Sequence, residues 1–149
     1  MANTMTRCLA ALALSAGMAA PALADDAGQA CLAQAQTQYA MNQCAGAQGQ
    51  RADRELNAVY QAVLKKHKDD KRFIAKLKTA QRAWLAWRDA ELEATYPARS
   101  DPTAYGSVFP MCWSGAQADL TSARTAQLRQ WLDAVAEGEM CAGSLPVRQ

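Results

Sequence analysis

Apolar side chains recur at intervals of three and four residues along most of the chain, while alternation of apolar and polar residues is scarce. This spacing places apolar residues on one face of a helix and predicts an all-α protein. The first long stripe starts from Ala52 and comprises Leu56, Val59, Tyr60, Val63 and Leu64. The second stripe comprises Phe73, Ile74, Leu77, Ala80, Trp84, Leu85 and Arg88. The third comprises Trp113, Ala116, Leu120, Ala123, Leu128, Trp131, Leu132 and Val135.

Residues that favour helix ends mark the boundaries of these stripes. Thr37 or Asn42 can cap the first long helix, and Asp69-Asp70 can cap the second, because short polar side chains accept hydrogen bonds from free N–H groups. The second helix must end before Pro97, since proline disfavours the helical conformation of the residue before it. These signals predict a small bundle of three long helices plus a short N-terminal helix.

A proline-rich segment separates the second and third helices. Residues 97–110 contain three prolines and one glycine, which predicts an irregular loop. Gly138 is the predicted end of the last helix. We expect the hairpin from about Gln38 to Thr95 to form the core, with the last helix packed on it.

The first two dozen residues have the features of a signal peptide. Arg7 supplies a positive charge, the run from Leu9 to Ala22 is uncharged, and Ala22-Leu23-Ala24 is a small-x-small cleavage site. The apolar run is shorter than the roughly 20 residues that cross a membrane, so a retained anchor is the weaker alternative. We expect residues 1–24 to be cleaved and residues 25–149 to form one domain in the periplasm or outside the cell.

Charge limits the classes of partner. Cleavage would leave 15 basic and 14 acidic side chains, because Arg7 is the only charged residue removed. A near-neutral chain argues against nucleic acid, which requires a basic surface. It also provides no strong overall field to attract a charged protein. Outside the signal segment no run is both apolar enough and long enough to cross a membrane, so we expect no membrane partner after cleavage.

Four cysteines remain after cleavage, and an even count in an exported protein indicates disulfides. A metal site is the competing explanation, but the chain has no C-x-x-C and only one histidine, His67. Cys31 and Cys44 would lie about 20 Å apart in one continuous helix. A disulfide requires Cα atoms within about 7 Å. We therefore expect a helix break near Thr37-Gln38 and a bond between Cys31 and Cys44.

Geometry does not favour a bond between the other two cysteines. A helix from Cys112 to Glu137 would be roughly 38 Å long. The residues that follow could bring Cys141 back by at most about 14 Å. Parity favours the pair and geometry opposes it, so Cys112 and Cys141 stay unassigned.

Several polar residues lie in line with the apolar stripes. Asp53, Asn57, Tyr60, Gln81 and Arg88 have this placement. A buried arginine must be paired and hydrogen-bonded, so Arg88 is expected against Asp53, Asn57 or Gln81. The structural interpretation is a network that fixes the helix register, and it is favoured over a polar binding site.

The chain shows no motif that carries chemistry. His67 lies in a lysine run at a helix end, where a solvated terminus is the expected role rather than a general base. Phosphate-binding loops, zinc motifs, nucleophile elbows and haem motifs are absent from the sequence. We therefore expect no catalytic residue, no metal, no cofactor and no enzymatic activity.

The polar residues and cysteines form a recognisable pattern that covers nearly all of the mature chain. Its parts are Cys31…Met41-Asn42-x-Cys44, Ala52-Asp53-x-Glu55-Leu56-Asn57-x-x-Tyr60, Leu77-x-x-Ala80-Gln81-Arg82-Ala83-Trp84-x-x-x-Arg88-Asp89-Ala90, Gly106-Ser107-x-x-Pro110-x-Cys112 and Leu120-Thr121-x-x-Arg124-x-x-x-Leu128. The chain thereby resembles the lysozyme-inhibitor LprI-like family of exported bacterial proteins. The resemblance implies a helical fold and, as some members do, inhibition of lysozyme.

One position departs from the family pattern. Leu92 stands where the family usually has a cysteine, and Cys112 would have been the partner of that cysteine. Cys141 is present instead, so the resemblance does not supply a second disulfide.

Two functions of different classes follow. One is an exported binding protein that inhibits a lysozyme, and the other is a periplasmic interaction, stress or immunity-like module with a different protein partner.

For inhibition, Tyr105, Gly106 and Ser107 could present a ring, a close-approaching backbone and a hydroxyl to the catalytic carboxyl groups of lysozyme. The plainer interpretation is that this loop only connects two helices. Near-neutral charge counts against inhibition, because many lysozymes are basic.

Overall fold

The computed structural model describes residues 23–147 and contains four α-helices and no strand in that range. The helices and one short 3₁₀ turn are α1 Leu23–Gln34, α2 Gln38–Lys66, α3 Lys71–Thr95, η1 Gly106–Val108 and α4 Phe109–Arg129. The predicted bundle of three long helices and a short N-terminal one is confirmed. The predicted signal segment lies outside the described residues, except for Leu23 and Ala24 in the first turn of α1.

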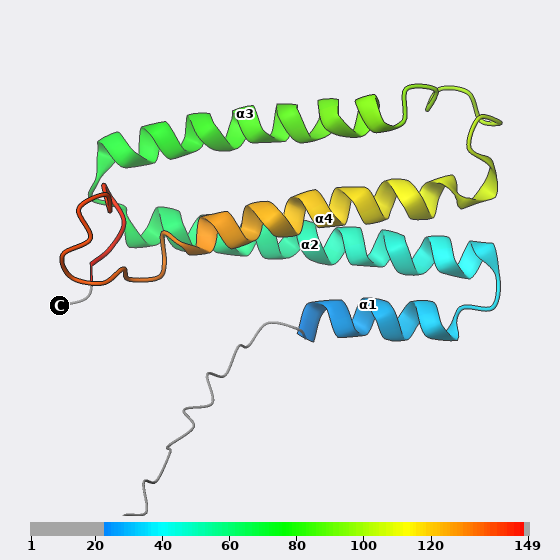
Figure 1. The fold of residues 1–149 in the computed structure, drawn as a ribbon, viewed down its shortest axis with the longest axis horizontal. Coiled ribbons are helices and arrows are strands. Elements are labelled where there is room, and N and C mark those ends of the chain that lie inside the picture. The colour runs from blue at the N-terminus through cyan, green and yellow to red at the C-terminus, as the bar shows by residue number, and fades with distance from the viewer. Residues whose placement is uncertain (1–22, 148–149) are drawn as a thin grey trace, which may run out of the picture.

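The helices lie side by side in the order α1, α2, α4, α3 (Figure 1). α2 and α4 run in the same direction, and α3 and α1 run opposite to them. α2 packs most closely against α4 rather than against α3, its neighbour in sequence. The expectation that the α2–α3 hairpin forms the core is therefore wrong, and α2 with α4 forms the centre of the bundle.

Small side chains explain the close approach of α2 and α4. The buried residues that allow it are Ala45, Gly49 and Ala52 on α2 and Ala118, Thr121 and Thr125 on α4. A Cβ atom added at Gly49 would lie 3.6 Å from the backbone oxygen of Ser114, so the two backbones are close there. Larger side chains at these positions would force the helices apart.

A larger apolar cluster fills the end of the bundle near the α2–α3 turn. Leu56, Val63, Leu77 and Leu128 are its buried members. The partly buried side chains around it are Val59, Tyr60, Leu64, Phe73, Trp84, Trp131 and Leu132. All three predicted stripes therefore contribute to one core.

The predicted caps explain where the long helices begin. The Thr37 hydroxyl accepts a hydrogen bond from the Ala40 N–H at 3.1 Å, and the Asp70 carboxylate accepts one from Phe73 N–H at 2.9 Å. Each bond satisfies a donor that has no partner inside its helix. Thr37 is thus the cap of α2, and Asn42 lies inside the helix.

A disulfide attaches α1 to α2. The chain breaks after Gln34 and resumes as helix at Gln38, so that Cys31 and Cys44 face each other with Cα atoms 5.7 Å apart. This bond confirms the expected pairing. Cys112, in the first turn of α4, and Cys141, in the C-terminal segment, are free thiols near opposite ends of the bundle (Figure 1).

The last helix is shorter than predicted. α4 ends at Arg129, and the expectation that it continues to Gly138 is wrong. After Arg129 the chain folds back on the turn end of α2: His67 Nε2 donates to the Trp131 carbonyl at 2.9 Å, and Lys66 Nζ donates to the Leu132 carbonyl at 2.6 Å. His67 is half-buried against Phe73, so its predicted place at a solvated terminus is also corrected.

The proline-rich loop is partly regular. η1 occupies Gly106–Val108, and Pro110 lies in the first turn of α4. The prediction of an irregular segment up to Pro110 is therefore too long. Proline fits the first helical turn because the N–H it lacks has no partner there.

Candidate functional site

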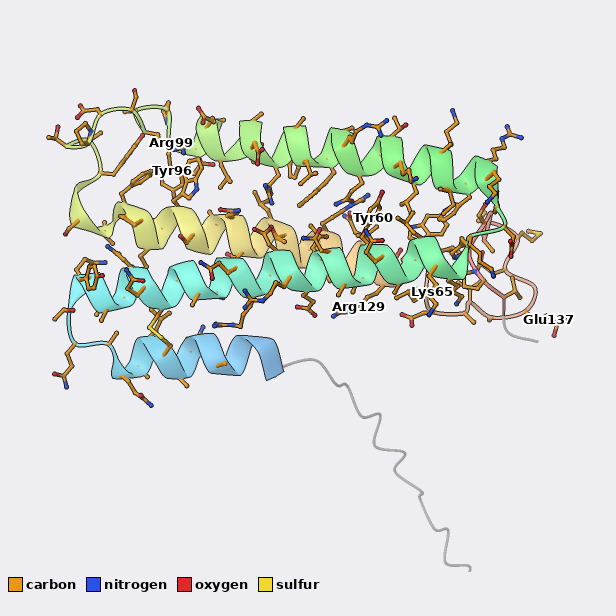
Figure 2. All side chains as sticks on the ribbon, turned by 180° about the vertical axis from the view of Figure 1, so that it is seen from behind. Tyr60, Lys65, Tyr96, Arg99, Arg129 and Glu137 are labelled. Atoms are coloured by element: carbon orange, nitrogen blue, oxygen red, sulfur yellow. A yellow bond between two sulfur atoms is a disulfide. The ribbon has the colours of Figure 1, made fainter. Side chains whose placement is uncertain are left out.

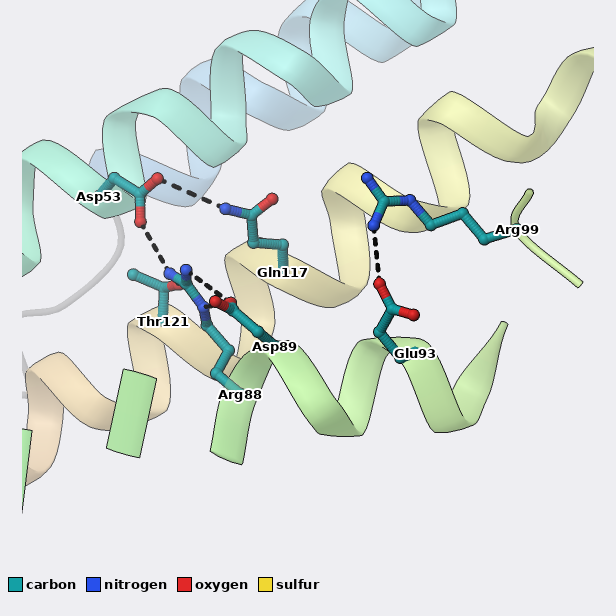
Figure 3. A network of polar contacts seen from close by, with 7 residues as sticks. All are labelled: Asp53, Arg88, Asp89, Glu93, Arg99, Gln117 and Thr121. Atoms are coloured by element: carbon teal, nitrogen blue, oxygen red, sulfur yellow. Dashed lines mark hydrogen bonds and ion pairs between the residues drawn. The ribbon is translucent and has the colours of Figure 1, made fainter. Parts of the chain in front are cut away.

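The contact between α3 and the α2–α4 pair is built on an arginine. Arg88 Nη1 donates to the Asp53 carboxylate on α2 at 3.2 Å, and Arg88 Nη2 donates to Asp89 at 2.9 Å. The same Nη1 lies 3.5 Å from the Thr121 hydroxyl on α4, and Gln117 Nε2 lies 3.5 Å from the second Asp53 oxygen. Figure 3 shows that these side chains come from three helices and meet at one point.

The arginine is far more buried than its partners. The Arg88 side chain is 12% exposed, whereas Asp53 is 42% and Asp89 is 64% exposed. The guanidinium also lies 5.4 Å from the centre of the Trp84 ring, a distance at which a cation and a ring attract each other. The carboxylates remain accessible to water, so this is a half-solvated ion pair.

A second arginine occupies the same contact one turn further along α4. Arg124 Nε donates to the side-chain oxygen of the buried Gln81 at 3.1 Å. Its guanidinium lies 5.9 Å from the Trp84 ring, on which Arg88 also acts. Burial lowers the pKa of Arg124 from its usual value, but an arginine remains charged at neutral pH.

The five polar residues expected to form one network do not all meet. Asp53 and Arg88 meet, while Gln81 bonds to Arg124 instead of Arg88. Tyr60 packs beside the apolar cluster, and Asn57 is exposed.

Sequence reasoning missed three members of these networks: Gln117, Thr121 and Arg124. Their spacing on α4 places them on the same side as Leu128, and this signal could have identified them.

Aromatic side chains gather at the opposite end from the α2–α3 turn, where α3 passes into the loop and the loop into α4. Tyr105 stacks on Phe109 with ring centres 5.2 Å apart, and Tyr96 meets both edge-on at 5.5 and 5.4 Å. Trp113 completes this aromatic cluster at 5.8 Å from Tyr96. Burial raises the pKa of Tyr96, and the nearby Cys112 and Tyr105 raise it further.

The aromatic cluster determines where the predicted partner-binding residues lie. Tyr105 is half-buried, and its hydroxyl oxygen accepts a hydrogen bond from the Ala98 N–H at 3.0 Å. Gly106 and Ser107 are exposed, and the Ser107 carbonyl accepts a hydrogen bond from Asn42 Nδ2 at 3.0 Å. Gly106 has φ +64°, which favours glycine. Tyr105 therefore supports the loop, and Gly106 and Ser107 form its surface.

Two further contacts restrain the loop. Arg99 lies 4.2 Å above the Trp113 ring and forms an ion pair with Glu93 at 2.8 Å. Thr103 donates to Asp101 through its N–H at 2.8 Å and its hydroxyl at 2.7 Å, and the hydroxyl and then the N–H lower the pKa of Asp101. The loop is thus held at several points along its length.

The near-neutral net charge conceals a separation of charge along the bundle. Residues 65–88 contain nine basic side chains and only two acidic ones, Asp69 and Asp70. Residues 89–119 contain only one basic side chain, Arg99; their five acidic ones are Asp89, Glu91, Glu93, Asp101 and Asp119. In Figure 2, Arg99 and Tyr96 mark the acidic end, and Lys65 lies at the other end.

Among residues 23–147, no group of three or more histidine, cysteine or carboxylate side chains is arranged to hold a metal ion. None of the helices in that range is long and apolar enough to cross a membrane.

Comparison with known protein families shows to which family the chain belongs. A family model described as "Lysozyme inhibitor LprI" matches residues 30–128, which include α2, α3, the loop and nearly all of α4. The chain belongs to the LprI family. An uncharacterized protein of Rhizobium meliloti (strain 1021) is 36% identical over 135 residues, covering 83% of this chain and 93% of that protein. No solved structure matches. The LprI match includes both arginine networks and Gly106 and Ser107.

Proposed function

We propose that this LprI-family protein is exported and inhibits a lysozyme by binding it, without catalysing a reaction. The family description, a lysozyme inhibitor, supports inhibition. The matched residues 30–128 include the loop and its supporting aromatic cluster, so the proposed binding surface lies within the family region. The surface proposed to bind lysozyme, called here the loop end, comprises residues 89–107. The arginine networks are proposed to have a structural role, since they hold α3 in place.

The observation that carries this proposal is the acidic charge of the loop end. Glu91, Glu93 and Asp101 are exposed, and the nine basic side chains of residues 65–88 precede this surface along α2 and α3. Lysozymes are commonly basic, and complementary potentials increase the rate of association. A near-neutral inhibitor therefore still has a surface that suits a basic enzyme.

The loop is also restrained before binding. The Tyr105 hydroxyl, the Arg99 contacts and the Asn42–Ser107 hydrogen bond fix it at both ends and in the middle. Binding would consequently require little further ordering of the loop, which preserves affinity.

The proposed contact uses the exposed part of this loop. Gly106 has no side chain, so its backbone can approach a cleft closely, and the Ser107 hydroxyl can donate a hydrogen bond to a carboxylate there. The catalytic groups of lysozyme are two carboxyls, which accept such bonds. Inhibition would follow from occupation of the cleft.

A muramidase assay with the purified protein tests the proposal. We expect inhibition at micromolar protein, and weaker inhibition by Gly106→Trp, whose side chain would fill the space in front of the loop. Gly143→Trp, at an exposed glycine of the C-terminal segment with φ +57°, is the matched control, because both substitutions strain the backbone equally. Failure to inhibit any lysozyme type would reject the proposal and favour the interaction, stress or immunity-like module. Equal inhibition by Gly106→Trp would retain the function and reject the site.

Export is tested separately. The mass of the protein recovered from the periplasm or medium should correspond to a chain that begins at Asp25. Recovery of the full-length chain from the membrane fraction would instead indicate a retained anchor.

A further inference from the structure

α3 has a face that no other element of residues 23–147 covers. Its buried residues Leu77, Gln81 and Leu92 lie on the side toward α2 and α4. The opposite side is exposed along the whole helix, and its central residues are Ala75, Thr79, Ala83, Ala86 and Ala90. In Figure 1, α3 forms an outer edge of the bundle. This surface is called here the outer face of α3.

A large aromatic side chain borders the outer face. Trp87 is 49% exposed on α3, although tryptophan is highly buried on average. Aromatic residues are enriched in protein interfaces, where they lose their contact with water. Trp87 is therefore the side chain that would gain most from a partner.

The charges of α3 are arranged against the dipole of the helix. Basic residues occupy its first half, beginning with Lys71 and Arg72, and acidic residues occupy its second half, ending with Glu91 and Glu93. A helix is stabilised by acidic residues at its start and basic residues at its end. Helix stability does not explain the observed order, but an oppositely directed helix with the same charges would complement it.

We propose that the outer face of α3 binds the outer face of α3 in a second copy of this chain, with the two helices antiparallel. The two-fold axis lies between the two copies, at right angles to α3 and level with the midpoint between Arg82 and Ala83, where the outer face points directly away from the core. Turning α3 about this axis places Arg72 opposite Glu93 of the copy. Because the interface is two-fold, each contact occurs twice.

The same rotation produces further favourable contacts. Lys78 lies on the same flank as Asp89 of the copy, and Lys76 lies beside Trp87 of the copy, which suits a cation and a ring. The small residues in the middle let the helices approach, and the two Arg82 side chains, which lie level with each other near the axis, extend along the flank into water. The carboxylates of Asp89 and Glu93 already bind Arg88 and Arg99 but remain 64% and 63% exposed, so they can accept a second cation.

The pairing is specific in direction. A parallel arrangement would place basic residues against basic residues and acidic against acidic, which is unfavourable. The antiparallel arrangement also puts the two loop ends at opposite ends of the dimer, so Gly106 and Ser107 stay accessible. Dimerisation is therefore independent of the proposed inhibition, and either can fail alone.

Sedimentation equilibrium over a range of protein concentrations tests this proposal. The measurements use a Cys141→Ser background, which removes an exposed thiol that could cross-link two chains. We expect a reversible monomer–dimer equilibrium that weakens as salt rises from about 0.05 M to about 0.5 M, because the pairs are exposed. A monomer at all concentrations up to about 1 mM, well above the working range of a specific dimer, would overturn the proposal.

Charge exchange tests the register. Arg72→Glu alone and Glu93→Arg alone should each weaken dimerisation about tenfold, because each replaces two attractive pairs by repulsive ones. The double variant restores opposite charges and should recover the original dimerisation constant to within about threefold. Arg54→Glu, an exposed position on α2, changes net charge equally and should have no effect. A double variant as weak as the single ones would overturn the antiparallel pairing.

Discussion

α4 and α3 are two long helices of the bundle that are held in place by different means. α4 contacts α2 through small residues such as Gly49 and Ala118, which bring the backbones close. α3 contacts the pair largely through long side chains: Arg88 extends toward Asp53 of α2 and Thr121 of α4 (Figure 3), and its guanidinium lies 5.4 Å from the Trp84 ring. One contact depends on close packing, and the other depends on polar and aromatic side chains.

This difference determines how each contact fails. Close packing allows no larger residue and admits no water, so it is lost only when the fold is lost. A half-solvated ion pair can exchange its partners for water, and it contributes less free energy. The loop that joins α3 to α4 is held by the aromatic cluster, which contacts both helices.

The largest effect is expected in the buried apolar cluster, where α4 packs on α2. Leu128 is fully buried, so Leu128→Ala should lower the free energy of unfolding by about 3–4 kcal/mol through lost contacts and a cavity. Leu85→Ala, on exposed α3 surface, should change it by about 0.5 kcal/mol or less. Denaturant unfolding measures both. Similar losses for the two variants would show that α3 is packed as closely as α4.

α1 is held by a third means, a covalent bond. Replacing Cys31 and Cys44 by serine should cost about 3 kcal/mol in the chain-entropy model of disulfides. Because α1 packs chiefly against α2, hydrogen exchange should increase in α1 and leave α4 protected. Cys141→Ser, which removes a free thiol, is the control. Increased exchange throughout the bundle would indicate that α1 is part of one cooperative unit.

The ion pair of Arg88 should contribute less to the free energy of unfolding than either Leu128 or the Cys31–Cys44 disulfide. Arg88→Ala should cost about 2 kcal/mol, below the 3–5 kcal/mol typical of a buried pair, because both carboxylates remain partly solvated. Arg54→Ala, an exposed control on α2, should have little effect. Unfolding monitored by circular dichroism distinguishes them. An effect of Arg88→Ala above that of Leu128→Ala would contradict the contrast between α3 and α4.

The smallest effect is expected in the loop. Tyr105→Phe removes the hydroxyl that accepts the Ala98 N–H bond, and it should cost about 0.5–1 kcal/mol because water can replace this partner. Tyr39→Phe, at a 72% exposed tyrosine, is the control. Thermal unfolding measures both, and hydrogen exchange of the loop should increase only for Tyr105→Phe. An unchanged loop would show that the aromatic rings alone hold it.

The sequence predicted the starts of the helices correctly where they depend only on neighbouring residues. Thr37 and Asp70 cap α2 and α3 because their side chains bond to nearby N–H groups, and this depends on neighbouring residues only. The Cys31–Cys44 bond followed from the length of a helix between them.

Features that depend on distant segments were not predictable in the same way. The apolar spacing continues past Arg129 through Trp131 and Leu132, but His67 and Lys66 bind the carbonyls of these two residues, and the helix ends at Arg129. Gln81 was grouped with Arg88 by its position on α3, yet its partner comes from α4. Spacing places a residue on a face, and it does not say which helix that face meets.

The most direct test of this account is the inhibition constant against a basic lysozyme, measured for two charge reversals. Glu91→Lys alters the acidic loop end, and Glu137→Lys makes the same change at the opposite end of the bundle (Figure 2). We predict that Glu91→Lys raises the inhibition constant about tenfold at low salt, since a complementary charge becomes a repulsive one, and that Glu137→Lys leaves it unchanged. Equal effects of the two substitutions, or no inhibition by the unaltered protein, would contradict the account.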